Sequence, residues 1–307
     1  MDTKIKVVGI GGSGTNAISR MMKCNIKGVE LIALNADIQD LQPTKAHRII
    51  QIGKKLTKGL GTGMDPEIGR EAAEEQKEEI KQALKGADMI FIACGLGGGC
   101  GSGASPVVAQ IAKNLGALTI AVVTRPFSFE GIQRAEIAEN SEKKLKSKVD
   151  TLIAISNDKL LEIAAERITV LEAFWLCDEI LRQAVQGISD LIILPGIINI
   201  DFADIKAVMK NSGSALFGVG KARGPGRAKI AAKMALNSPL LNISCKGAKG
   251  ILFNVSGNGD VSLSEVDEVA KIITQEVSPT AKIIFGAIQN EKLKKEEIKV
   301  TVIATGF

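Results

Sequence analysis

The chain has 307 residues, of which 45% are hydrophobic and 24% are charged, and its net charge is +5. This length is enough for two packed domains, and the composition excludes a disordered chain. The basic runs at residues 143–148 and 292–295 are flanked by acidic residues, so nucleic acid is not predicted as a partner.

The cysteines and the apolar runs predict a cytoplasmic protein without direct membrane insertion. No C-x-x-C pair and no signal peptide is present, which favours free thiols in a reducing compartment. No apolar run reaches the roughly 18 residues that a membrane span needs. The single histidine, His47, has no nearby Cys or His, so a His-based metal site or a Ser-His-Asp triad is not expected. The five cysteines are Cys24, Cys94, Cys100, Cys177 and Cys245.

Short β-branched runs alternate with helical patterns through the first half of the chain. This alternation predicts right-handed βαβ units and a mostly parallel sheet. In chain order the pattern predicts strand 5–10, helix 13–24, strand 29–34, helix 65–84, strand 88–93, helix 104–115, strand 118–123, helix 130–146 and strand 151–155.

A long helix is predicted from about residue 170 to residue 193, where an apolar stripe runs until Pro195-Gly196 ends it. We expect this helix to be the spine between two domains, so that the fold class is α/β with a smaller second α/β domain. The expected divisions are 1–168, 169–200 and 201–307. The second domain is predicted to contain strands 215–218, 250–255, 281–287 and 299–304, and helices 227–236 and 264–274.

A first glycine loop, residues 9–16, follows a strand and opens a helix. Glycine lets the backbone approach a phosphate, and the helix N-terminus offers free N–H groups and a positive dipole. Gly9, Gly11 and Gly14 match G-x-G-x-x-G, a weak signal that NAD-binding Rossmann enzymes share. An NAD-dependent oxidoreductase is therefore an alternative at this point.

A second glycine loop, residues 95–103, follows the strand near 88–93 and favours a different ligand. So many glycines contribute no buried side chain, and we therefore interpret them as a second phosphate cradle rather than as packing residues or a flexible loop. A third glycine-rich turn, residues 58–63, is placed to close the pocket. Three loops suit a triphosphate, and no G-x-x-x-x-G-K-[ST] is present. Helix dipoles and Mg²⁺ would then neutralise the charge, with no metal ligand predicted from the chain itself.

Two motifs resemble a known family. Gly97-Gly98-Gly99-Cys100-Gly101-Ser102-Gly103 resembles the tubulin signature of FtsZ and tubulin, and Asn199-Ile200-Asp201-Phe202-Ala203-Asp204 resembles the FtsZ synergy loop. The resemblance extends from about Ile5 to Phe307 and is nearer to bacterial or plastid FtsZ than to tubulin. It implies a Rossmann-like GTP-binding domain at 1–168 and a C-terminal activation domain at 201–307.

The resemblance also implies the nucleotide site. Glu130 and Arg134 match ribose and phosphate contacts, although an ordinary i,i+4 pair is an alternative. Asn157 and Asp178 match guanine contacts, and Phe174 matches the aromatic residue beside the base. The full set of implied GTP-binding residues and glycine-loop positions is Gly11, Gly12, Ser13, Gly14, Thr15, Asn16, Gly61, Gly63, Gly97, Gly98, Gly99, Cys100, Gly101, Thr124, Glu130, Arg134, Asn157, Phe174 and Asp178.

The resemblance implies that Asp201 and Asp204 are catalytic. Their spacing puts both carboxylates on one face if a helix starts near Asp201. The alternative is that Asp201 caps the helix and Asp204 is merely solvated. In the family these acids enter the pocket of the next subunit, so the implied protein is a Mg²⁺-dependent GTPase that polymerises head to tail.

The implied setting is the cytoplasmic division site at midcell, or the stroma of a plastid, with division-machinery proteins as further partners. A non-catalytic nucleotide-binding filament or regulator is the second alternative. The sequence stops at Phe307, and it does not include the family's variable linker or the tail peptide that binds membrane adaptors. Two alternatives stay open: a shortened chain, or a natural form that cannot use those adaptors.

Two residues depart from the family pattern inside the implied site. Cys100 stands where the family usually has Thr, and a thiol is a weaker hydrogen-bond donor than a hydroxyl. At the N-terminus of a helix we expect its pKa to be lowered. Trp175 stands where the family usually has a smaller or polar residue, so the rim of the pocket is expected to differ.

Overall fold

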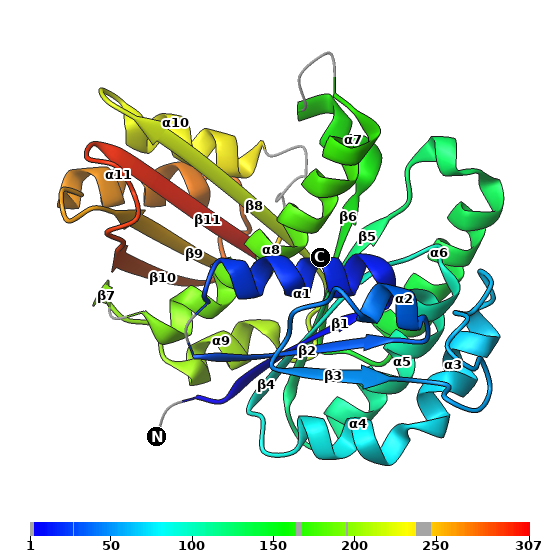
Figure 1. Cartoon of the computed structure of the whole chain (residues 1–307). Helices are drawn as coiled ribbons and strands as arrows, with labels where there is room; N and C mark the ends of the chain where they lie inside the picture. The colour runs from blue at the N-terminus through cyan, green and yellow to red at the C-terminus, as the bar shows by residue number, and fades with distance from the viewer. Residues whose placement is uncertain (1–2, 27, 164–167, 195, 238–246) are drawn as a thin grey trace. The chain divides into compact units, whose positions relative to one another are not determined.

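The computed structural model describes residues 3–26, 28–163, 168–194, 196–237 and 247–307. The chain forms two compact units, Met1–Gln186 and Gly187–Phe307, which meet in sequence inside one long helix (Figure 1). Pro195 and Cys245 lie outside the described residues.

The first unit is built on a parallel sheet. In its described part, six strands lie in the order β3-β2-β1-β4-β5-β6, and every neighbouring pair is parallel. From β1 the chain adds β2 and β3 on one side of the sheet and then β4, β5 and β6 on the other, so the strand order reverses between β1 and β4. Open α/β sheets bind their ligands at such a point. The strands are β1 (Ile5–Ile10), β2 (Val29–Asn35), β3 (Arg48–Gln51), β4 (Met89–Gly95), β5 (Leu118–Arg125) and β6 (Thr151–Ser156).

Helices cover both faces of this sheet. Helix α1 packs on one face, while α3, α4 and α5 pack on the other (Figure 1). The helices of this unit are α1 (Gly11–Lys23), α2 (Ile38–Leu41), α3 (Pro66–Glu75), α4 (Lys77–Leu84), α5 (Gly99–Asn114), the 3₁₀ helix η1 (Ser128–Glu130), α6 (Ile132–Lys146), α7 (Asn157–Ile163) and the first part of α8 (Val170–Ile193).

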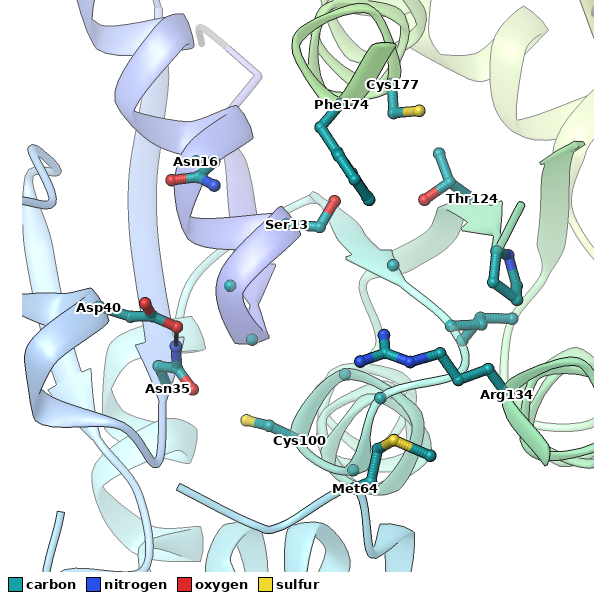
Figure 2. A pocket seen from close by; sticks show the side chains of 18 of the residues that line it. Ser13, Asn16, Asn35, Asp40, Met64, Cys100, Thr124, Arg134, Phe174 and Cys177 are labelled. Atoms are coloured by element: carbon teal, nitrogen blue, oxygen red, sulfur yellow. Dashed lines mark hydrogen bonds between the residues drawn. The ribbon is translucent and has the colours of Figure 1, made fainter. Parts of the chain in front are cut away.

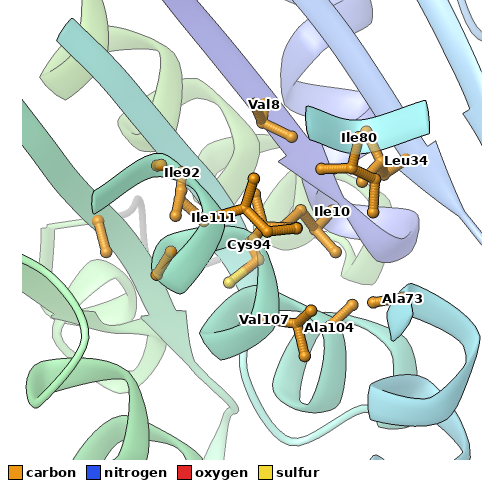
Figure 3. Packing of buried hydrophobic residues seen from close by; sticks show 14 of the residues in the cluster. Val8, Ile10, Leu34, Ala73, Ile80, Ile92, Cys94, Ala104, Val107 and Ile111 are labelled. Carbon is orange, nitrogen blue, oxygen red and sulfur yellow. The ribbon is translucent and has the colours of Figure 1, made fainter. Parts of the chain in front are cut away.

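The main core lies between the sheet and the α3–α5 layer. Alternate residues of β1 and β4, such as Ile10 and Ile92, point toward Val107 and Ile111 of α5 (Figure 3). Ile10, Ile92 and Cys94 are fully buried. Burial of this apolar surface fixes the ends of β1 and β4, and therefore the positions of the loops that follow them.

The second unit has a sheet with the strand order β8-β11-β9-β10-β7. The sheet is mixed, and β11 is antiparallel to both of its neighbours. Buried residues of α10 and α11 pack against β9 and β11 to form its core. Its elements are β7 (Gly196–Ile198), α9 (Phe202–Met209), β8 (Gly213–Arg223), α10 (Arg227–Leu236), β9 (Gly250–Gly257), α11 (Leu263–Thr274), β10 (Lys282–Gln289) and β11 (Glu297–Thr305).

The α/β fold class is confirmed, but several elements differ from the prediction. The helix predicted over 65–84 is two helices, α3 and α4, separated at Gln76. The helix predicted at 104–115 begins at Gly99, so half of the predicted glycine loop is helical. Sequence reasoning missed β3, β7, α2 and α7, which are short elements with little periodicity. Among the described residues, every helix is too short or too polar to cross a bilayer.

Candidate functional site

A pocket of about 550 Å³ opens in the first unit where β1 and β4 end. This is the reversal point of the parallel sheet, and the segments following both strands contribute to its wall. Figure 2 shows Ser13 and Phe174 facing each other in it and Arg134 pointing inward. The lining residues are Gly11, Gly12, Ser13, Asn16, Asn35, Asp37, Asp40, Gly61, Thr62, Met64, Gly95, Leu96, Gly98, Gly99, Cys100, Gly101, Thr124, Pro126, Glu130, Arg134, Asn157, Phe174, Cys177 and Asp178.

Two helix N-termini meet at this pocket without side-chain caps. The N-cap residues are Ile10 for α1 and Gly98 for α5, and neither makes a side-chain cap hydrogen bond. Neither helix has an acidic residue in its first turn. The two ends touch, since a Cβ on Gly11 would lie 3.0 Å from the backbone nitrogen of Gly101. Free N–H groups and two positive dipole ends therefore converge, which is an arrangement that binds phosphate.

The glycines of the second loop have two uses, and the prediction that they are not packing residues was wrong for three of them. A Cβ on Gly99, Gly101 or Gly103 would come within 2.4 Å of a neighbouring atom, and for Gly103 within 1.9 Å of the Pro66 carbonyl oxygen. These glycines let the first turns of α5 lie against α3 and the end of β4. By contrast, a Cβ on Gly98 would meet nothing within 4 Å.

Four of the predicted contact positions do not line the pocket. Gly14 is buried, and a Cβ there would lie 2.5 Å from the Ala93 carbonyl oxygen, so it serves the packing of α1 on the sheet. Thr15 is buried and donates its hydroxyl to the Gly12 carbonyl at 3.0 Å. Gly97 packs against Arg134, and Gly63 is exposed. The remaining predicted nucleotide contacts all line the pocket.

Sequence reasoning missed the segment after β2. Asn35, Asp37 and Asp40 line the pocket, and the Asn35 side-chain nitrogen donates to Asp40 Oδ2 at 3.1 Å. The same carboxylate oxygen would lie 3.1 Å from a Cβ on Gly12, so it is beside the first glycine loop. The available signal was their position at the carboxyl end of a parallel strand next to β1.

Aromatic residues and an unpaired amide form another part of the wall. Phe174 packs against the buried Phe127 in a T-shaped pair with ring centroids 5.4 Å apart, and it lines the pocket with 41% of its surface exposed. Asn157 is 5% exposed, and its side-chain oxygen has no hydrogen-bond partner in the described part of the chain. A buried amide oxygen without a partner is costly, so this atom is suited to accept a ligand's N–H.

Asp178 lies beside these groups, on the same face of α8 as Phe174. Its Oδ1 accepts the Ser13 hydroxyl at 3.3 Å, and its Oδ2 accepts from Arg20 Nη2 at the same distance. Burial raises the pKa of Asp178 to about 6, although Arg20 and Ser13 both act to lower it. The carboxylate is therefore poorly solvated and is stabilised only in part by its neighbours.

Glu130 and Arg134 form the i,i+4 pair that was the alternative interpretation, with Arg134 Nη1 3.1 Å from Glu130 Oε2. The other Glu130 oxygen accepts the Phe127 backbone N–H at 2.9 Å. Both side chains nevertheless line the pocket. The pair is therefore compatible with a ligand contact, in which Arg134 would exchange one acidic partner for another.

Cys100 differs from its predicted state. Burial raises the pKa of its thiol to about 11, and the backbone amides of Ala36 and Gly11 lower it only in part. The expectation of a lowered pKa was wrong because the desolvation of the thiolate outweighs the helix N-terminus. The sulfur nevertheless lies on the pocket wall near Asn35 and Asp40 (Figure 2).

The two predicted catalytic acids belong to the second unit and do not line this pocket. Helix α9 starts directly after Asp201, so the expected helix start is present. Asp201 makes no side-chain cap hydrogen bond, which argues against the capping alternative. Asp204 lies in the first turn, and both side chains are exposed.

Comparison with known proteins decides the class. Residues 4–165 match the tubulin/FtsZ family GTPase domain, and residues 213–307 match the FtsZ family C-terminal domain. The chain belongs to the tubulin/FtsZ family. As a member it is a filament-forming cytoskeletal GTPase, so the choice left open by the first glycine loop is settled against an NAD-dependent oxidoreductase.

Solved structures agree with this assignment. The chain is similar to an empty FtsZ dimer of M. jannaschii, with 48% identity and a TM-score of 0.96 over all of this chain and 89% of that chain. A GTPγS-bound protofilament of CetZ2 from Haloferax volcanii has 20% identity and a TM-score of 0.83 over 98% of this chain and 92% of that chain. The CetZ2 likeness bears on the fold alone.

We predict that Cys100 reacts slowly with thiol reagents at neutral pH and more slowly still when GDP is bound. The raised pKa of its thiol leaves little thiolate, and a phosphate against the α5 N-terminus would cover the sulfur. The exposed Cys24 is the internal control and should react at one rate with and without GDP. Peptide mapping by mass spectrometry measures both thiols. Equal Cys100 labelling with and without GDP would place the nucleotide elsewhere.

Proposed function

We propose that the chain binds Mg²⁺-GTP in the pocket of its first unit and hydrolyses it only when the next copy, stacked head to tail, supplies Asp201 and Asp204. The observation that supports this proposal best is that the pocket holds groups for binding GTP, whereas the two acids belong to the other unit and do not line the pocket. In the cell the resulting filament would scaffold division, at the cytoplasmic division site and with division-machinery proteins as partners.

The phosphates would lie between the first turns of α1 and α5. The uncapped N–H groups and both helix dipoles face this spot, and Gly61 and Thr62 extend the wall from the third glycine turn. Thr124 adds a hydroxyl donor nearby. A triphosphate would satisfy the helix N-termini that are otherwise without caps.

The base would lie between Phe174 and Asn157, the first residue of α7. Guanine presents N1–H and N2–H₂ side by side, and an ionised carboxylate such as Asp178 accepts both. The unpaired oxygen of Asn157 offers a further acceptor. Phe174 would stack on the ring.

The donor set fits a magnesium ion that is held mainly by the nucleotide. No group of three or more His, Cys, Asp or Glu side chains with metal-binding geometry occurs among the described residues. Mg²⁺ usually takes one or two carboxylates together with phosphates and water. Asp40, beside Gly12 of the first glycine loop, and Asp37, beside Gly61 of the third glycine turn, are the pocket carboxylates that would hold it. When bound, the ion would neutralise phosphate charge and polarise the phosphoryl group.

Hydrolysis would depend on the two acids of the next copy. Asp201 and Asp204 are exposed, one at the N-cap and one in the first turn of α9, so both are accessible to another molecule. There they would orient and polarise the attacking water while the first chain holds the phosphates. Such a contact joins different surfaces of identical subunits, so it propagates a filament.

We predict a strong preference for GTP over ATP that depends on Asp178. Adenine offers no donor at N1, so the acceptor position of Asp178 that faces the ligand would be left unfilled, which costs about 2 kcal/mol or more. Calorimetry should show weaker GTP binding and little discrimination in Asp178→Ala. Glu139→Ala serves as a control, because Glu139 is an exposed acid of α6 outside the pocket lining. Equal affinity of the unaltered protein for ATP and GTP would refute this assignment of the base site.

We also predict that Asp204→Ala binds GTP within about twofold of the unaltered protein but hydrolyses it at least about 100-fold more slowly, because positioning of water accounts for factors of this size. Asp267→Ala provides a matched control, since Asp267 is an exposed acid in the first turns of α11. Nucleotide binding and phosphate release are measured in parallel. A variant that loses GTP binding together with turnover would contradict the division of roles.

A further inference from the structure

A tryptophan, an arginine and an aspartate link α1 to α8 at the edge of the pocket. The guanidinium carbon of Arg20 lies 5.1 Å from the centroid of the Trp175 ring, within the roughly 6 Å range of a cation–π contact. The same guanidinium donates through Nε and Nη2 to Asp178 Oδ2, at 3.4 and 3.3 Å. Arg20 therefore joins the pocket carboxylate to an aromatic face outside the pocket lining.

The contacts with Asp178 are long, and both go to one oxygen. Two parallel hydrogen bonds, one to each carboxylate oxygen, would fix the guanidinium by themselves. Two long contacts to a single oxygen do not. The indole ring provides the second anchor. Trp175 and Asp178 are three residues apart on α8, so they lie on neighbouring positions of one helix face and hold the guanidinium from two sides.

The two oxygens of Asp178 are held by different groups. Ser13 donates to Oδ1 and Arg20 donates to Oδ2, which sets the plane of the carboxylate. A carboxylate has about four acceptor positions. Ser13 takes one on Oδ1 and the two long Arg20 contacts take both on Oδ2, so Oδ1 keeps a free position, and a second ligand donor would replace one of the Arg20 contacts. A base with two adjacent N–H donors matches that orientation.

We propose that Arg20, held against the ring of Trp175, is a positioning residue that keeps the Asp178 carboxylate ionised and oriented for the paired N1–H and N2–H₂ donors of guanine. This inference rests on the proposed function, because it takes GTP as the ligand and Asp178 as the reader of the base. It also assigns a role to Trp175, at a position where the family usually has a smaller or polar residue.

The surroundings of Asp178 make its charge state depend on Arg20. Arg20 of α1 is the cation in contact with the Asp178 carboxylate. The residues next to Asp178 on α8 are Cys177 and Glu179. The Cys177 thiol has a pKa raised to about 12, chiefly by burial, so it is neutral, and Glu130 of η1 adds negative charge toward that thiol. Burial holds the pKa of Asp178 at about 6 even with Arg20 present. Removal of Arg20 would raise it further, toward a protonated group at neutral pH.

The first experiment compares GDP with IDP, whose base lacks the 2-amino group, by calorimetry on the full chain. The unaltered protein should prefer GDP by about tenfold, which is the contribution of one charge-assisted hydrogen bond. In Arg20→Met the GDP affinity should fall about tenfold and the GDP/IDP ratio should approach one. Trp175→Leu should lose about two- to fivefold in GDP affinity, and Trp175→Phe should lose less because it retains a ring face. Lys23→Met removes one positive charge from the exposed end of α1 and should change neither value.

The second readout is the pH profile. GDP affinity of the unaltered protein should fall as pH drops through about 6, where Asp178 takes up a proton. In Arg20→Met the fall should begin at a higher pH. Trp175 is the only tryptophan of the chain, so its fluorescence in the nucleotide-free protein should also change near pH 6, and Asp178→Asn should abolish this change.

The outcomes separate this inference from the function on which it rests. If GDP binds well but the GDP/IDP ratio and the pH profile are the same in Arg20→Met, Trp175→Leu and the unaltered protein, the positioning role is wrong and the GTP site stands. If the unaltered protein binds no guanine nucleotide, the proposed function and this inference fail together. Should Arg20→Met not fold, the two Trp175 variants and the fluorescence titration decide.

Discussion

The convergence of two positive helix ends is the constraint on which this structure depends. Helix α1 starts directly after β1, α5 starts after the short segment 96–98 that follows the neighbouring strand β4, and their first turns touch at Gly11 and Gly101. Each end carries about half a positive charge, so their approach is unfavourable unless an anion lies between them. The buried core beneath β1 and β4 holds the ends together, and glycine permits the contact because a side chain would separate the helices. The proposed phosphate site is thus a consequence of sheet topology rather than of a charged side chain.

This constraint explains why the pocket lining uses so little positive side-chain charge. The cation on the lining, Arg134, is already paired with Glu130, and three other acids, Asp37, Asp40 and Asp178, line the same cavity. In the proposed function, a highly charged nucleotide is bound by backbone dipoles and a divalent ion, while side chains select the base. This separation of phosphate binding from base selection is physically reasonable. Helix dipoles cannot distinguish guanine from adenine, whereas a buried carboxylate can, because it needs a donor that guanine offers and adenine lacks.

The sequence was most informative where a strand led into glycines. Alternating patterns predicted β1 and α8 with the bounds that are observed, and the two glycine loops predicted the pocket. The patterns could not show that Gly99–Gly103 would be helical, because glycine disfavours helix and the close approach of α3 is a tertiary contact. Asp37 and Asp40 were missed because they reach the site only through the pairing of β2 with β1. The Cys100 pKa was mispredicted because burial cannot be read from a local motif. The catalytic roles of Asp201 and Asp204 stay a prediction.

The central claim is that one active site needs two chains, and mixing two inactive variants tests it most directly. Gly98→Asp has room for its side chain and would place a carboxylate at the N-cap of α5, where it excludes phosphate but leaves Asp204 intact. Asp204→Ala keeps the pocket and loses the acid. In an equimolar copolymer about a quarter of the interfaces join an intact pocket to an intact acid, so the mixture should recover up to about a quarter of normal GTP turnover per subunit. Turnover in the mixture no greater than the sum of the separate variants would contradict the shared site.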